Sequence, residues 1–149
     1  MPPSSSASRP SLLGVFGHPD DESLLAGGVL AQHAAAGAAT AVVTATWAPD
    51  SHRAGELADA LDILGAGRPR MLGFADARIP DSAPGRPRLC DAPLEEVAEL
   101  IVEHIRAVRP QIVVFPVKWM CSGWFPASGG PRRGQRAGAP RRVKWSRSP

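Results

Sequence analysis

The stretch SLLGVFGHPDDES, residues 11–23, joins an apolar run to a cluster of ionisable and metal-binding side chains. Residues 11–17 have the length, apolar composition and terminal glycine of a buried strand. An alanine-rich helical pattern starts at Ser23 and ends at Gly37. The stretch therefore predicts a strand that passes into a helix, with polar chemistry at the junction.

The alternation of strands and helices continues beyond this stretch. Residues 75–92 contain three prolines and no regular period, which indicates a loop. Asp91, at the end of this loop, is expected to cap the helix that follows. The further predicted segments are strands at 39–46, 70–74 and 111–115, and helices at about 51–66 and 93–108. Asp50-Ser51 can cap the first of these two helices, and Gly65 and Gly67 close it.

Apolar strands that alternate with helices of this length favour a parallel sheet covered on both faces. We therefore predict an α/β fold, a Rossmann-like three-layer sandwich with a mostly parallel sheet that is incomplete at its C-terminal end. Such sheets place their chemistry at the carboxyl ends of the strands. The sequence GHPDDE, residues 17–22, occupies that position on the first strand.

This motif carries the donor types of a catalytic metal site. Pro19 fixes one φ angle of the turn, so His18 and Asp21 can converge on one ion while Asp20 points toward its coordination sphere. A catalytic zinc site typically has three protein ligands and a water, and a carboxylate outside the ligand set can act as general base. A purely structural alternative stays open, because Pro-Asp-Asp-Glu also makes a good helix N-terminus.

The sequence GHPDDES at residues 17–23 resembles the opening motif of the LmbE-like, or PIG-L, deacetylases. The similarity covers residues 11–116, which we treat as the deacetylase domain. It includes Arg53 and Glu56 at the start of the second helix, and LGFAD at residues 72–76. The resemblance implies a zinc-dependent hydrolase that removes an acetyl group from an N-acetylated amino sugar or glycoconjugate.

The resemblance also implies a role for each residue of the site. His18 and Asp21 match two zinc ligands, and Asp20 matches the general base. Arg53 and Asp76 match positions near the sugar of the substrate, although each can equally be a solvated charge at a helix start or in a loop. The implied cofactor is Zn²⁺ or another divalent metal.

The third zinc ligand of the family belongs to a second, histidine-containing motif shortly after the fourth strand. This chain has no histidine after His104. His33 is expected to be a surface or packing residue of the first helix, and His104 a partly buried core residue of the last helix. His52 is the nearest substitute. An inactive or truncated homologue that lacks the third ligand is therefore the alternative to an active enzyme.

Charge divides the chain into an acidic body and a basic end. Residues 1–116 hold nine Lys and Arg and all 14 Asp and Glu, so their net charge is 9 − 14 = −5. Residues 117–149 hold eight Lys and Arg and no acidic residue, so their net charge is +8. The whole-chain net charge of +3 therefore says little about the body.

The basic end shows no strand or helix period, and we assign it no fold. Codons that can encode residues 130–136, read one base later, can yield Asp-His followed by small residues. We therefore expect the sequence from about residue 116 onward to come from a shifted or otherwise aberrant reading frame. A nucleic-acid-binding role for this end is a further alternative, which we do not favour because no predicted fold presents its tryptophans in a groove.

The remaining expectations concern compartment and partners. Residues 1–10 are expected to form a disordered leader without the apolar core of a signal peptide, and no run reaches the roughly 18 apolar residues of a membrane span. Cys90 and Cys121 are far apart in sequence and form no metal-ligand pair, so a reduced, cytoplasmic chain is expected, and a disulfide between them is left open. The expected partner is a small N-acetyl sugar or glycoconjugate, and association into a homo-oligomer is left open.

Overall fold

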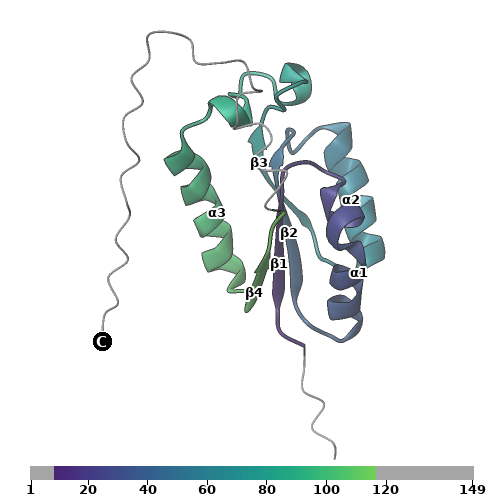
Figure 1. The fold of residues 1–149 in the computed structure, drawn as a ribbon. Coiled ribbons are helices and arrows are strands. Elements are labelled where there is room, and N and C mark those ends of the chain that lie inside the picture. Colours follow the sequence, from purple (N-terminus) through teal and green to yellow (C-terminus); the bar gives the residue numbers. More distant parts are fainter. Residues whose placement is uncertain (1–8, 117–149) are drawn as a thin grey trace, which may run out of the picture.

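The computed structural model describes residues 9–116 and shows a four-stranded parallel sheet between helices (Figure 1). Its strand order is β3-β2-β1-β4, so β1 lies between β2 and β4. The strands are β1 (Leu12–Phe16), β2 (Thr40–Thr46), β3 (Pro69–Phe74) and β4 (Ile112–Val114). The predicted Rossmann-like α/β architecture is confirmed. Most of the predicted leader, and the whole segment 117–149, lie outside the described residues.

Helices cover both faces of this sheet. Figure 1 shows α1 and α2 together on one face and α3 on the opposite face. Among the helices of residues 9–116, none combines the length and apolar character needed to cross a membrane. The helices are α1 (Asp21–Ala35), α2 (His52–Leu64) and α3 (Leu94–Val108), with short 3₁₀-helices η1 (Pro80–Ser82) and η2 (Leu89–Asp91) in the predicted loop.

The central strand β1 is buried on both faces, which explains its continuous apolar sequence. Successive side chains of a strand point to opposite faces. Leu13 and Val15 accordingly belong to the core that includes Val97 of α3, whereas Leu12 and Phe16 belong to the core formed with α1 and α2. The strand therefore joins the two layers of the core.

The strand order changes direction beside β1. From β1 the chain adds β2 and then β3 on one side of β1, and β4 then pairs with the other edge of β1. In open α/β sheets, ligands bind at the carboxyl ends of the strands where the order reverses in this way. The turn that follows β1 lies at that point.

The ends of the second helix follow their sequence signals. Ser51 is the N-cap, and its hydroxyl accepts a hydrogen bond from the Ala54 backbone N–H at 3.3 Å. Gly65 ends α2 in the left-handed conformation, with φ of 68°.

The first helix, α1, begins at Asp21, two residues earlier than predicted. The second half of the GHPDDE motif therefore belongs to this helix.

The predicted cap of the third helix is wrong. Asp91 lies in η2 and its carboxylate accepts a hydrogen bond from Arg88 Nε at 2.6 Å. The helix instead begins after Pro93, with no capping hydrogen bond from a side chain. Arg88 provides a local charged partner for Asp91, and the 3₁₀ turn separates that carboxylate from the start of α3.

His104 lies on the apolar stripe of α3, as predicted for a packing residue. Leu100, Ile101, Ile105 and Val108 of this stripe pack against the core. Burial lowers the pKa of His104, and the positive charge of Arg70 lowers it further, against a smaller opposite effect of Glu103. The folded chain therefore favours the neutral imidazole.

We expect the free energy of unfolding to fall as the pH drops below about 6.5, because unfolding frees His104 to take up a proton. The variant His104→Gln should show a flatter decrease in urea unfolding between neutral and mildly acidic pH. His52→Gln, which changes an exposed histidine, is the matched control. Equal slopes for His104→Gln and the unmodified chain would contradict this prediction.

The strand β4 forms an apolar edge of the described sheet. Within residues 9–116, no strand pairs with the side of β4 opposite β1. Ile112 and Val113 are 36% and 37% exposed, and Phe115 is 53% exposed. Unpaired edges with exposed apolar side chains promote association between chains.

Replacing an apolar side chain of this edge by a charged one should reduce association. We expect Val113→Lys to raise the monomer fraction severalfold, measured by size-exclusion chromatography with light scattering. Ile63→Lys, at an 86% exposed position on α2, removes surface hydrophobicity away from the edge and should have less effect. A chain that is monomeric at all concentrations before substitution would contradict the prediction.

Candidate active site

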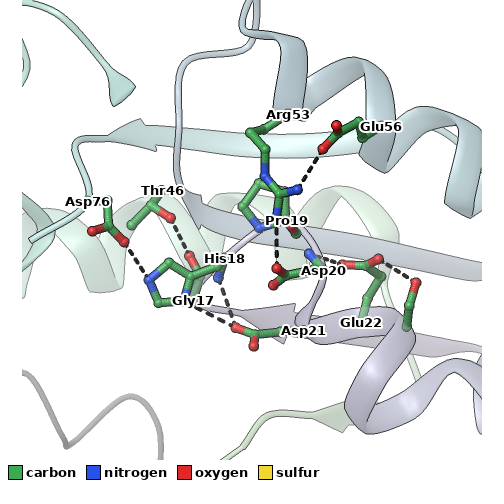
Figure 2. A network of polar contacts seen from close by, with 11 residues as sticks. Gly17, His18, Pro19, Asp20, Asp21, Glu22, Thr46, Arg53, Glu56 and Asp76 are labelled. Atoms are coloured by element: carbon green, nitrogen blue, oxygen red, sulfur yellow. Dashed lines mark hydrogen bonds and ion pairs between the residues drawn. The ribbon is translucent and has the colours of Figure 1, made fainter. Parts of the chain in front are cut away.

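The candidate site is the turn between β1 and α1, residues 17–20, together with side chains from two neighbouring strand ends. Thr46 ends β2, and both its backbone N–H and its hydroxyl donate to the Gly17 carbonyl, at 3.0 and 2.8 Å. These bonds tie the start of the turn to the adjacent strand. Figure 2 shows Asp76 and Arg53 approaching the same turn from different directions.

His18 lies between two carboxylates. Its Nε2 is 2.7 Å from Oδ2 of Asp76, and its Nδ1 is 3.4 Å from Oδ2 of Asp21. The same Asp21 oxygen accepts the His18 backbone N–H at 2.9 Å. The imidazole is partly exposed, whereas both carboxylates are nearly buried, so the ring forms the open side of the cluster.

Asp20 has a backbone conformation that residues other than glycine rarely adopt, with φ of 151° and ψ of −25°. Glu22 stabilises this conformation, because its Oε2 accepts the Asp20 backbone N–H at 2.9 Å. Its other oxygen accepts the Ser23 hydroxyl at 2.7 Å, and Glu22 is only 1% exposed. Backbone strain of this kind is concentrated at functional sites.

Arg53 clamps the outer side of the turn. Its Nη2 donates to Asp20 Oδ2 at 2.7 Å and to the Pro19 carbonyl, and its Nη1 donates to Glu56 Oε2 at 2.6 Å. Burial lowers the pKa of Arg53, but hydrogen bonds and the negative charges of Glu56 and Asp20 outweigh this and raise it above its ordinary value. The guanidinium lies 5.9 Å from the centre of the Trp47 ring, which adds a cation–π contact.

Asp76 is fixed by the loop that follows β3. Its Oδ1 accepts the backbone N–H groups of Arg78 and Ile79, at 2.7 and 3.2 Å. Its own backbone N–H donates to the Ser82 hydroxyl at 2.8 Å. With Oδ1 held by the loop, Oδ2 is the oxygen directed at His18 (Figure 2).

All five residues singled out for the site lie around this one turn, and the other histidines make contacts of a different kind. The five are His18, Asp20, Asp21, Arg53 and Asp76. His33 is buried, with Nδ1 2.9 Å from the Pro10 carbonyl oxygen, and His104 lies on α3. His52 packs edge-on against Trp47 at 5.4 Å.

Sequence reasoning did not anticipate the parts played by Glu22, Thr46 and Trp47. From the sequence, Glu22 is only a favourable negative charge at the start of a helix. Thr46 and Trp47 lie at the carboxyl end of a predicted strand. Parallel sheets carry their functional residues at this position, so the sequence did offer a reason to include both.

Glu22 should contribute more to stability than an ordinary acidic residue in the first turn of a helix. We expect Glu22→Ala to lower the free energy of unfolding by about 1–3 kcal/mol, because it removes the acceptor of the Asp20 backbone N–H. Glu95→Ala is the matched control: Glu95 holds the same second position of α3 but is exposed, and its effect should stay within about 0.5 kcal/mol. Equal losses for the two variants in urea unfolding would contradict the prediction.

The donor atoms of His18 and Asp21 fit two ligand positions of zinc. Bonds of about 2.0–2.1 Å at a tetrahedral angle place two ligand atoms about 3.4 Å apart, which is the observed separation of Nδ1 and Oδ2. Within residues 9–116, no three His, Cys, Asp or Glu side chains are grouped so as to hold a metal ion. The described part of the chain therefore provides a pair of donors and no complete ligand set.

A comparison with protein families agrees with this geometry. Residues 13–120 match the family described as PIG-L, GlcNAc-PI de-N-acetylase. The chain belongs to the PIG-L family. The predicted family resemblance is thereby confirmed.

Individual relatives of this PIG-L protein are larger. It is 38% identical over 135 residues to the 1D-myo-inositol 2-acetamido-2-deoxy-alpha-D-glucopyranoside deacetylase of Kineococcus radiotolerans, covering 69% of this chain and 37% of that protein. It is 37% identical over 148 residues to the Mycobacterium avium protein of the same name, covering 83% of this chain and 47% of the relative. The chain thus spans less than half the length of these relatives.

A solved structure shows the same fold. The N,N'-diacetylchitobiose deacetylase from Pyrococcus horikoshii matches with a TM-score of 0.57 and 20% sequence identity. The match covers 73% of this chain and 41% of that chain. It supports the arrangement of strands and helices described above.

Proposed function

We propose that this chain forms the motif-bearing part of a zinc-dependent N-deacetylase that acts on N-acetylglucosamine conjugates. Members of the PIG-L family are N-deacetylases, which hydrolyse an amide bond. The observation that carries the proposal is the placement of His18, Asp21 and Asp20 on one turn, with the donor atoms of the first two at zinc-ligand spacing.

The residues at the turn have different proposed roles in such a hydrolysis. The chemistry that zinc supplies in hydrolases is polarisation of a carbonyl oxygen and generation of a nucleophile from water. His18 and Asp21 would hold the metal. Asp20, half-exposed, is the proposed general base that accepts the proton of the attacking water and passes it to the departing amine. The reaction yields acetate and a free amine.

Arg53 has two roles in this proposal. Its hydrogen bond to Asp20 Oδ2 fixes the orientation of that carboxylate. Its position beside the turn, with Asp76 on another side, suits recognition of sugar hydroxyl groups. The substrate class is proposed from the relatives, whose names share a glucosamine unit with an acetylated nitrogen.

Acetate release from an N-acetylglucosaminyl-inositol, together with zinc content, tests this function. Asp21→Ala should abolish stoichiometric zinc, because it removes a ligand. Asp20→Asn should retain zinc and lower kcat by roughly 10²–10⁴-fold, because it removes the base while keeping the side-chain shape. Asp62→Asn, an exposed carboxylate at the far end of α2, is the control and should alter neither quantity.

The outcomes separate this proposal from its alternatives. Zinc binding without acetate release would identify a homologue that binds but does not catalyse. Failure of the purified chain to bind zinc at all would overturn the proposal. A nucleic-acid-binding role rests on residues 117–149, outside the described residues, and salt-sensitive binding lost on their removal would support it.

A further inference from the structure

The two ring nitrogens of His18 have different relationships to their neighbouring carboxylates. The 2.7 Å from Nε2 to Asp76 Oδ2 is a normal charge-assisted hydrogen-bond length. The 3.4 Å from Nδ1 to Asp21 Oδ2 is too long for a strong hydrogen bond. Two zinc ligands are about 3.4 Å apart. The distance between Nδ1 and Asp21 Oδ2 matches this spacing, whereas the distance between Nε2 and Asp76 Oδ2 is that of a hydrogen bond.

These distances determine which nitrogen carries the proton. A neutral imidazole has one N–H and one free lone pair, and an ionised carboxylate accepts hydrogen bonds without donating any. Asp76 therefore selects the tautomer in which Nε2 is protonated. The lone pair of Nδ1 is then directed toward Asp21, where a cation can bind.

Asp76 is well suited to impose this choice, because its carboxylate has little freedom to move. Its side chain is about 10% exposed. Oδ1 is held by two backbone N–H groups of the loop, those of Arg78 and Ile79. Reorienting Oδ2 away from His18 would break these bonds, so the loop after β3 transmits a fixed orientation to the ring.

We propose that Asp76 is a positioning residue that fixes the tautomer and ring orientation of His18, and thereby presents Nδ1 to the metal. Carboxylates that accept the second N–H of a metal-binding histidine act in this way in many metal sites. This role is distinct from the contact with the sugar inferred from the family. The effect of Asp76 on zinc binding rests on the proposed function, whereas its effect on the tautomer of His18 does not.

The substitution Asp76→Asn tests this role with little change in shape. The Asn oxygen can still accept the two loop N–H groups, which holds the amide NH₂ toward His18. That group donates to Nε2, so the favoured tautomer should reverse and place the proton on Nδ1. We expect zinc affinity, measured by competition with a chelator, to fall about 10–100-fold.

The tautomer can be observed without metal or activity. Nitrogen-15 NMR of the metal-free chain at about pH 8, where an ordinary imidazole is neutral, distinguishes Nε2–H from Nδ1–H, and His18→Gln assigns the signals. Asp81→Asn is the matched control, because it removes the same charge from an exposed position of the same loop. It should leave both the tautomer and the zinc affinity unchanged.

An Nδ1–H tautomer in the unmodified chain would overturn the proposal, and this result needs no substitution. The proposal would also fail if Asp76→Asn kept the original tautomer, or if Asp81→Asn lowered zinc affinity as much as Asp76→Asn. The chain could show the expected tautomer, and its reversal in Asp76→Asn, and yet bind no zinc. That result would support the positioning role of Asp76 and refute the proposed metal function.

Discussion

The parallel pairing of β1 with both β2 and β4 is the constraint on which the site depends. A strand paired on both edges and buried on both faces must leave the sheet through a turn at its end, and here the turn starts at Gly17. Parallel strands bring their carboxyl ends to one edge, so Thr46 at the end of β2 and Asp76 after β3 reach the same turn. Because β1 lies inside the sheet, the motif at its end meets residues from the ends of two other strands.

Several carboxylates lie close together in this site, and hydrogen bonds stabilise some of them. Arg53 partners Asp20, and buried Glu22 is held by backbone and hydroxyl donors. Asp21 and Asp76 instead both face His18, so two carboxylates share one imidazole. A divalent cation between His18 and Asp21 would offset their charge, so the electrostatics and the donor spacing favour the same position.

Local sequence patterns predicted most of the fold because the local and tertiary preferences agree. The continuous apolar run of β1, the Ser51 cap and the Gly65 stop each appear in the structure at their expected places. The Asp91 cap failed because Arg88, three residues earlier, offers this carboxylate a competing partner. The burial of Glu22 also escaped prediction, since a charge in a first helical turn is ordinarily exposed.

The sequence by itself determined the strand-turn-helix order, the α/β class and the family resemblance, and it named the side chains that the structure brings together around the turn. It could do so because apolar period, capping residues and a compact motif are local properties. The tertiary structure alone decided how these side chains divide their tasks: Arg53 on Asp20, Glu22 beneath the turn, and Asp76 on one nitrogen of His18. The physical reason is that a hydrogen-bond partner depends on distance and direction, which sheet order and loop conformation set across residues far apart in the chain.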